Sequence, residues 1–127
     1  PSQRGLARGK DRPAATAAAD LTEEAMIVRI WRGWTTRANA ASYESLLRTE
    51  ILPGIAARGI AGYRGVELLR RDAAGEAEFM TVMRFDSLRD VREFAGQNYE
   101  AAVVPPKARA LLARCDEQAV HYTVVEG

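Results

Sequence analysis

The sequence contains few of the residues on which common metal and disulfide sites depend. Its 127 residues include one cysteine, Cys115, and one histidine, His121. A single cysteine cannot form a disulfide within the chain, which favours a reducing compartment, and we expect a cytoplasmic protein. One histidine and one cysteine without a close cluster of carboxylates do not make a zinc site, so no metal is expected. No apolar run reaches the roughly 18 residues that cross a bilayer, so no membrane segment is expected.

An excess of charge of one sign is also lacking. The chain has 18 Lys and Arg residues against 17 Asp and Glu residues, a formal net charge of +1. A charge this small creates no field that would attract DNA or RNA, so nucleic-acid binding is not expected. The segment "GLARGKD" has three residues between its glycines where a phosphate-binding loop has four. No G-x-S-x-G nucleophile elbow occurs either, so neither motif assigns a function.

Residues 1–25 differ from the rest of the chain because they lack large apolar side chains. Leu6 and Leu21 are the only large aliphatic residues in this segment, which is dominated by Gly, Pro and Ala. Such a segment cannot bury enough apolar area to offset its ordering entropy. We therefore predict a disordered extension over residues 1–25 and one folded domain over residues 26–127. A partner-binding arm and an organelle transit peptide are the alternatives for the extension.

From Met26 onward, the spacing of the apolar residues changes several times, so strands and helices alternate. Runs rich in β-branched and aromatic residues predict four strands, at residues 26–34, 62–71, 76–85 and 119–126. The segment "DAAGE" that joins the second and third strands predicts a hairpin that makes these strands antiparallel neighbours.

Apolar residues at spacings of three and four predict the helices. The first covers residues 39–59, with Asn39 as its N-cap, a kink or early end at Pro53, and a stop at Gly59. The second covers residues 88–96, and a short further helix follows in "PPKARALLARC".

The order β-α-β-β-α-β predicts an α+β, ferredoxin-like fold with a four-stranded antiparallel sheet and helices on one face. The first strand is nevertheless apolar on both faces, because Ile27 and Trp31 alternate with Val28, Ile30 and Trp34. An uncovered apolar face needs a partner, and a second copy of the same sheet is the simplest one. The sequence therefore predicts a homodimer.

Five segments taken together resemble the antibiotic biosynthesis monooxygenase-like family of the dimeric α/β-barrel superfamily. They are "MIVRIWRGWT", "LPGIAARGIAGYRG", "AEFMTVMRFDS", "FAGQNYEAAVVPP" and "HYTVVE", and the resemblance covers about Met26 to Glu126. It implies a two-fold barrel in which each subunit has a pocket between its sheet and its helices. Characterised members include oxygenases that oxidise polycyclic phenols or anthrones with O2 and without flavin, haem or metal.

The resemblance therefore implies a small hydrophobic or aromatic ligand and no cofactor. A deprotonated phenol can pass one electron to O2 itself, so the protein must only ionise, orient and dry its substrate. The first strand carries no asparagine or histidine, so the residues of the haem-degrading relatives cannot be carried over. This difference argues against haem.

His121 is the candidate catalytic base, because imidazole accepts a proton near neutral pH. Its alternative interpretation is a wall histidine bonded to a backbone carbonyl or a carboxylate. Arg29 lies in the middle of the first strand and needs a partner, for which Glu67 and Glu78 are the obvious carboxylates. In the oxygenase hypothesis, further side chains bind the substrate or its anion: Arg29, Trp31, Tyr63, Arg84, Asn98 and Tyr99.

Three functions remain open at this point. The first is a cofactor-independent monooxygenase acting on a small aromatic or polyketide-like compound. The second is a non-catalytic dimer of the same fold that binds a small ligand or a protein partner. The third is an isomerase or cyclase that uses the same base without oxygen. A closed pocket for two or three fused rings beside His121 would favour ligand binding there, and a volume filled by side chains would favour a structural protein that binds no ligand.

Overall fold

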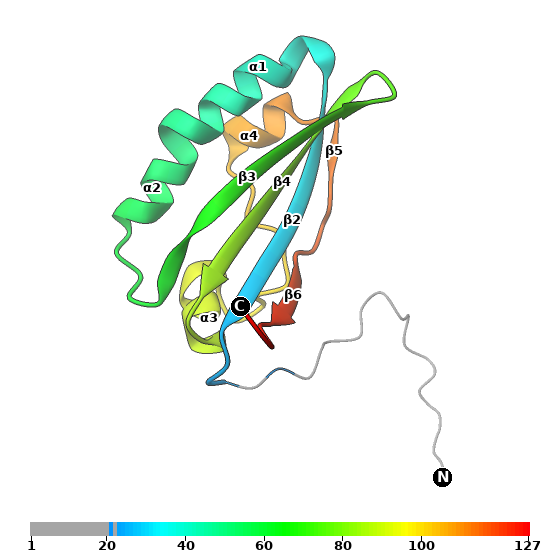
Figure 1. The fold of residues 1–127 in the computed structure, drawn as a ribbon. Coiled ribbons are helices and arrows are strands. Elements are labelled where there is room, and N and C mark those ends of the chain that lie inside the picture. The colour runs from blue at the N-terminus through cyan, green and yellow to red at the C-terminus, as the bar shows by residue number, and fades with distance from the viewer. Residues whose placement is uncertain (1–20, 22) are drawn as a thin grey trace.

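An antiparallel sheet with helices on one face forms the frame of the protein (Figure 1). The computed structural model describes Leu21 and residues 23–127. The strands are β2 (Ile27–Thr36), β3 (Tyr63–Ala73), β4 (Glu76–Phe85), β5 (Arg114–Cys115) and β6 (Val120–Thr123). The helical elements are α1 (Arg37–Leu46), the π-helix η2 (Leu47–Ile51), α2 (Leu52–Ala57), α3 (Leu88–Ala95) and α4 (Pro106–Leu111).

The central strand of the sheet is β2, which pairs with β4 along one side and with β5 and β6 along the other. The order β3-β4-β2 followed by β5 and β6 confirms the predicted α+β, ferredoxin-like fold. The hairpin is also confirmed, and its turn consists of Ala74 and Gly75, which both have positive φ, as a two-residue turn requires.

The predicted last strand, residues 119–126, is wrong in its bounds. The segment that pairs with β2 is divided into β5 and β6, so the sheet has five strands rather than four. The chain leaves the ladder between them because its backbone bonds to a neighbouring loop instead. The amide of Ala119 donates to the carbonyl of Glu100 at 2.8 Å, and Gln118 forms a bridge with Ala101.

The first helix also differs from its prediction. Thr36 is its N-cap, with Oγ1 accepting a hydrogen bond from the amide of Asn39, whose own side chain donates to the carbonyl of Leu111. Asn39 therefore links α1 to α4 and does not cap the helix. Pro53 does not end the helix early, because it lies in the first turn of α2, but the helix departs from regular α geometry in the π-helix η2 directly before it.

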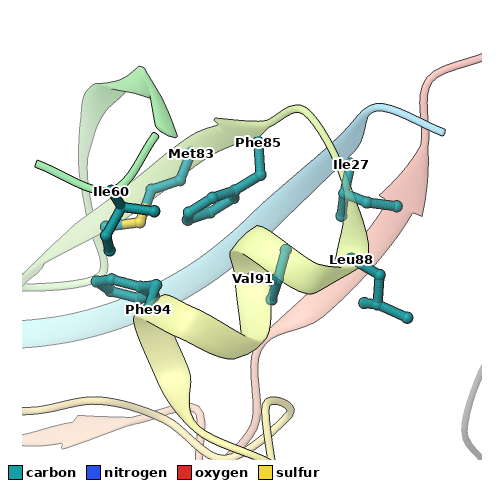
Figure 2. Packing of buried hydrophobic residues seen from close by; sticks show 7 residues of the cluster. All are labelled: Ile27, Ile60, Met83, Phe85, Leu88, Val91 and Phe94. Atoms are coloured by element: carbon teal, nitrogen blue, oxygen red, sulfur yellow. The ribbon is translucent and has the colours of Figure 1, made fainter. Parts of the chain in front are cut away.

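The elements α1, η2 and α2 form one helical rod along the sheet (Figure 1). Two apolar clusters fill the space between the sheet and the helices. The first cluster joins β2 and β4 to α3, and Figure 2 shows its seven buried residues: Ile27, Ile60, Met83, Phe85, Leu88, Val91 and Phe94. The second cluster lies under α1 and α4, and in it Tyr43 packs edge-on against Phe79 with ring centroids 4.9 Å apart.

No described helix covers the opposite face of the sheet (Figure 1), which is apolar at its centre and carries charged side chains around it. Ile30 of β2 lies opposite Val82 of β4 there, whereas the neighbouring pairs are mixed, Val28 with Arg84 and Arg32 with Met80. On the flanking strands, Leu69 is 48% exposed and Tyr122 is 57% exposed.

Part of the predicted extension contacts the folded domain. Leu21 packs against the first cluster, and Glu23 forms an ion pair with Arg92 of α3 at 2.9 Å. These contacts begin before Met26, where we placed the domain boundary. Residues 1–20 and 22 lie outside the described residues, and so does the prediction made for them. None of the described helices combines the length and the apolar character that a membrane crossing requires.

Gly33 provides a test of the packing around Trp31. A Cβ atom at Gly33 would lie 2.8 Å from Cδ2 of Leu112 and 2.9 Å from the Trp31 ring. We therefore expect Gly33→Ala to lower the free energy of unfolding by about 1–3 kcal/mol, measured by urea denaturation. Gly54→Ala is the control, because a Cβ atom there meets nothing within 4 Å. Equal stability of the Gly33→Ala and wild-type proteins would contradict this packing.

Candidate ligand-binding site

A cavity of about 50 Å³ lies between the sheet and the helical rod, where the two apolar clusters meet. Its wall is mostly apolar, and its polar side chains are Arg29, Trp31, Tyr43 and Thr81. A cavity that accepts one benzene ring has roughly 150 Å³, so this conformation does not hold two or three fused rings. His121 does not line the cavity. By the criterion set from the sequence, these two observations argue against a pocket for fused rings beside His121.

Arg29 contributes the one positive charge of this wall, and its side chain is only 3% exposed. Nη1 donates to the carbonyl of Tyr99 at 2.6 Å and to Nε2 of His121 at 3.1 Å. Nη2 donates to the carbonyl of Ala101 at 3.1 Å. The Phe94 ring centroid lies 5.3 Å from the guanidinium carbon. Within the described part of the chain, neutral groups alone therefore hold this guanidinium.

The predicted ion pair of Arg29 with Glu67 or Glu78 is wrong. Arg29 points to the helix side of the sheet, whereas the register places both glutamates on the other face. Glu67 is exposed, and Glu78 pairs with Arg71 at 3.0 Å.

The charge of Arg29 therefore has no counter-ion among the residues that the structure describes. Burial lowers the pKa of Arg29 to about 10, so the group stays protonated at neutral pH. Three hydrogen bonds use three of its five N–H groups, which leaves two as donors for a ligand. A buried charge is costly unless an opposite charge is near, so an anion in the cavity would be stabilised here.

His121 supports this arginine from the neighbouring strand, at the position opposite Arg29. Because arginine only donates, Nε2 of His121 must accept, and the ring proton lies on Nδ1, which is buried without a partner among the described residues. Burial, and then the charge of Arg29, lower the pKa of His121 to about 4. The imidazole is therefore neutral at pH 7 and orients Arg29. It lies in the wall of the sheet, and its partner is a guanidinium rather than a carbonyl or a carboxylate.

The other predicted site residues divide into two groups. Trp31 lines the cavity with its ring. Its indole N–H is already used, because it donates to the carbonyl of Asp116 at 2.7 Å. Tyr99 belongs to the Arg29 group through its carbonyl, and its ring packs edge-on against His121. The remaining three lie away from the cavity: Tyr63 packs against Phe85, Arg84 is exposed on the far face of the sheet, and Asn98 is exposed in a turn.

Two further polar residues of the cavity wall were missed from the sequence. Thr81 lies on the inward face of β4 together with Phe79 and Met83. A polar residue at an inward position of a predicted strand was therefore the signal that the sequence offered. Tyr43 lies in the apolar stripe of the first helix, where an aromatic residue indicates only core. Burial, and then Cys115, raise the pKa of Tyr43, so its hydroxyl can donate a hydrogen bond but does not act as a base. No group of three or more metal-ligating side chains occurs in the described ranges.

The low pKa of His121 predicts a pH dependence of stability. The unfolded chain binds this proton below about pH 6.5, whereas the folded chain binds it only near pH 4. The free energy of unfolding should therefore fall as the pH decreases from 6.5 to 4, with about 1–3 kcal/mol of the loss due to His121. Above pH 7 this contribution is constant.

Urea unfolding of the wild type and His121→Gln at pH 7.5 and pH 4.5 measures this difference. Glutamine keeps an acceptor oxygen for Arg29 but does not titrate. The free energy of unfolding of His121→Gln should therefore fall less between the two pH values than that of the wild type. An equal loss in both proteins would contradict the lowered pKa.

Comparison with known proteins gives results for the fold alone. No family model and no curated protein matches the sequence. A Bacillus cereus structure, described as a candidate antibiotic biosynthesis monooxygenase, has a TM-score of 0.58 and 12% identity, covering 81% of this chain and 96% of that chain. Rv0793 of Mycobacterium tuberculosis has a TM-score of 0.55 and 18% identity, covering 80% and 97%.

A NIPSNAP family protein of Agrobacterium tumefaciens is also similar, with a TM-score of 0.53 and 18% identity, covering 85% of this chain and 93% of that chain. Identities this low establish the fold and not the activity. The chain has the ferredoxin-like α+β fold of the antibiotic biosynthesis monooxygenase structures, as its resemblance to that family predicted.

Proposed function

We propose that this protein binds a small phenolic, aromatic or polyketide-like compound in the Arg29 cavity and oxidises it with O2 without a cofactor. The observation that carries the proposal is the buried guanidinium of Arg29, which has neutral partners and faces an apolar cavity. Such a site favours a ligand that is apolar in its rings and anionic at one oxygen. A phenolate has both properties.

The proposed chemistry requires little of the protein. Arg29 stabilises the phenolate, which lowers the pKa of the bound phenol, so its proton can leave to solvent without a buried base. The phenolate passes one electron to O2, and the resulting superoxide and phenoxyl radical combine at a ring carbon. Loss of water from the hydroperoxide then gives a quinone. One O2 and one phenol therefore yield one quinone and one water, with no external reductant.

The walls of the cavity fit this role. The Trp31 ring offers a surface on which a planar ligand can stack, and the apolar residues around it exclude water from the radical pair. The fold likeness to the Bacillus cereus protein makes an oxygenase the first activity to test. The proposed location is the cytoplasm, which suits the single cysteine.

A second candidate function is a non-catalytic dimer that binds a small anion or aromatic ligand. The small volume of the cavity and the absence of His121 from its wall favour this candidate. An isomerase or cyclase would use the same anion site without consuming oxygen.

Oxygen uptake by chelator-treated protein with 1-naphthol and anthrone tests the oxygenase. We expect one O2 consumed per quinone formed, and a fall of about 100-fold or more in kcat/KM for Arg29→Met, because an anion-stabilising donor is lost. Arg89→Met is the matched control and should retain full activity, since Arg89 is exposed on α3, away from the cavity and from the uncovered face of the sheet. Binding without oxygen uptake would favour the second candidate. Full turnover by Arg29→Met would reject the assigned site.

We further propose that two copies pair through the apolar face of the sheet. Half-buried Ile30 and Val82 lie at its centre, and exposed Leu69, Val120 and Tyr122 extend it across the flanking strands. A patch of this kind on an isolated subunit is typical of an interaction surface. A two-fold axis would place the same patch of a second copy against it.

Sedimentation of micromolar protein tests this pairing. We expect about twice the subunit mass of 13.9 kDa for the wild type and a single subunit for Val82→Glu, because the new carboxylate would lie opposite Glu67 and could not be buried beside it. Ser45→Lys, on the exposed side of α1, is the control and should leave the mass unchanged. A monomeric wild type at this concentration would refute the pairing.

A further inference from the structure

We propose that α2 is a hinged lid over the cavity, which bends at the π-helix η2 and is held closed by Arg58. The lid depends on the proposed function only for the chemical class of the ligand that enters the cavity. The arrangement of hinge, lid and latch is a property of the chain itself.

The size of the cavity favours movement of one wall when a ligand enters. At about 50 Å³ it is roughly a third of the volume that accepts a single benzene ring, so an aromatic ligand enclosed within it must displace part of the wall. The sheet side cannot give way easily, because β2 and β4 pair without interruption from Ile27 and Phe85 to Thr36 and Glu76. The helical side includes Leu47, Ile51, Leu52 and Ile55, all from η2 and α2.

The lid is the most loosely packed helix beside the cavity. No residue of α2 is buried, and its two cavity-facing residues, Leu52 and Ile55, are half-buried. By contrast, α1 buries Ala40 and Tyr43, and α3 buries four residues. Few buried apolar contacts mean a low free energy for local opening.

Both ends of α2 depart from regular α-helix geometry. At its start, the amide of Leu52 bonds to the carbonyl of Leu47 in the wide turn of η2, and Pro53 follows, which has no amide to bond back. π-turns inside α-helices are rare and occur mostly at functional sites. At its end, Gly59 has a φ of 70°, which ends the helix before the chain enters β3.

Arg58 is the latch, because it fastens the end of α2 to α3. Its guanidinium donates to the carbonyl of Phe94 at 3.2 Å and to that of Glu93 at 3.1 Å. It also lies 5.4 Å from the Phe94 ring, which lines the cavity and lies 5.3 Å from Arg29. Release of Arg58 would therefore free the end of α2 from α3. The ion pair of Lys107 with Glu50 is exposed and contributes little.

Amide hydrogen exchange and ligand-binding rate of Arg58→Ala test the lid. We expect exchange in residues 52–58 to become about tenfold faster, as the loss of two hydrogen bonds from one cation predicts, while β2 and β4 keep the wild-type rates. The association rate of 1-naphthol, followed through Trp31 fluorescence, should rise several-fold. Arg89→Ala is the matched control, because Arg89 is an exposed arginine of α3 outside the hinge and the lid. It should change neither rate.

Unchanged exchange in residues 52–58 would overturn the lid, and so would an equal increase in β2 and β4, which indicates global destabilisation. Arg58→Gln keeps an N–H donor without the charge and should give intermediate rates if Arg58→Ala fails to fold. Exchange is measured without ligand, so the lid is tested even if no phenol is oxidised. Faster exchange in α2 without oxygen uptake would reject the proposed oxygenase and retain the lid.

Discussion

The burial of the Arg29 guanidinium is the constraint on which the rest of the site depends. A charge in the middle of a central strand must have partners, and the chain supplies two carbonyls, of Tyr99 and Ala101, together with the neutral nitrogen of His121. These contacts fix the loop after α3 and the strand β6 against β2. None of these partners carries a negative charge, so the site satisfies the hydrogen bonds of the cation but leaves its charge for a ligand.

The position of this charge relative to the core explains why the site could support chemistry. The cavity lies where the two apolar clusters meet, so the cation faces a space with few other polar groups. Electrostatic attraction is stronger in such an environment than in water, and a phenolate beside Arg29 would be favoured over the neutral phenol. His121 contributes by remaining neutral, because a protonated imidazole could not accept the hydrogen bond that orients the guanidinium.

Much of the fold could be predicted from local patterns. The alternation of inward and outward residues predicted the bounds of β4 as residues 76–85. Ser87 and Gly96 predicted the two ends of α3. The site was predicted less well, since backbone carbonyls hold Arg29, and no residue type indicates which carbonyls a loop presents. Strand alternation could have excluded Glu67 and Glu78, which lie on the other face from Arg29. The hydrogen bond of the Trp31 indole could not be predicted for the same reason. Its N–H donates to the backbone carbonyl of Asp116, which is far away in the sequence.

The central claim is that Arg29 binds the anionic form of an aromatic ligand. The ultraviolet spectrum of 1-naphthol bound to the protein at pH 7, without oxygen, tests this claim most directly, because naphthol and naphtholate absorb at different wavelengths. We expect the naphtholate spectrum in the wild type and the neutral spectrum in Arg29→Met. A neutral spectrum in the wild type, or the same spectrum in both proteins, would contradict it.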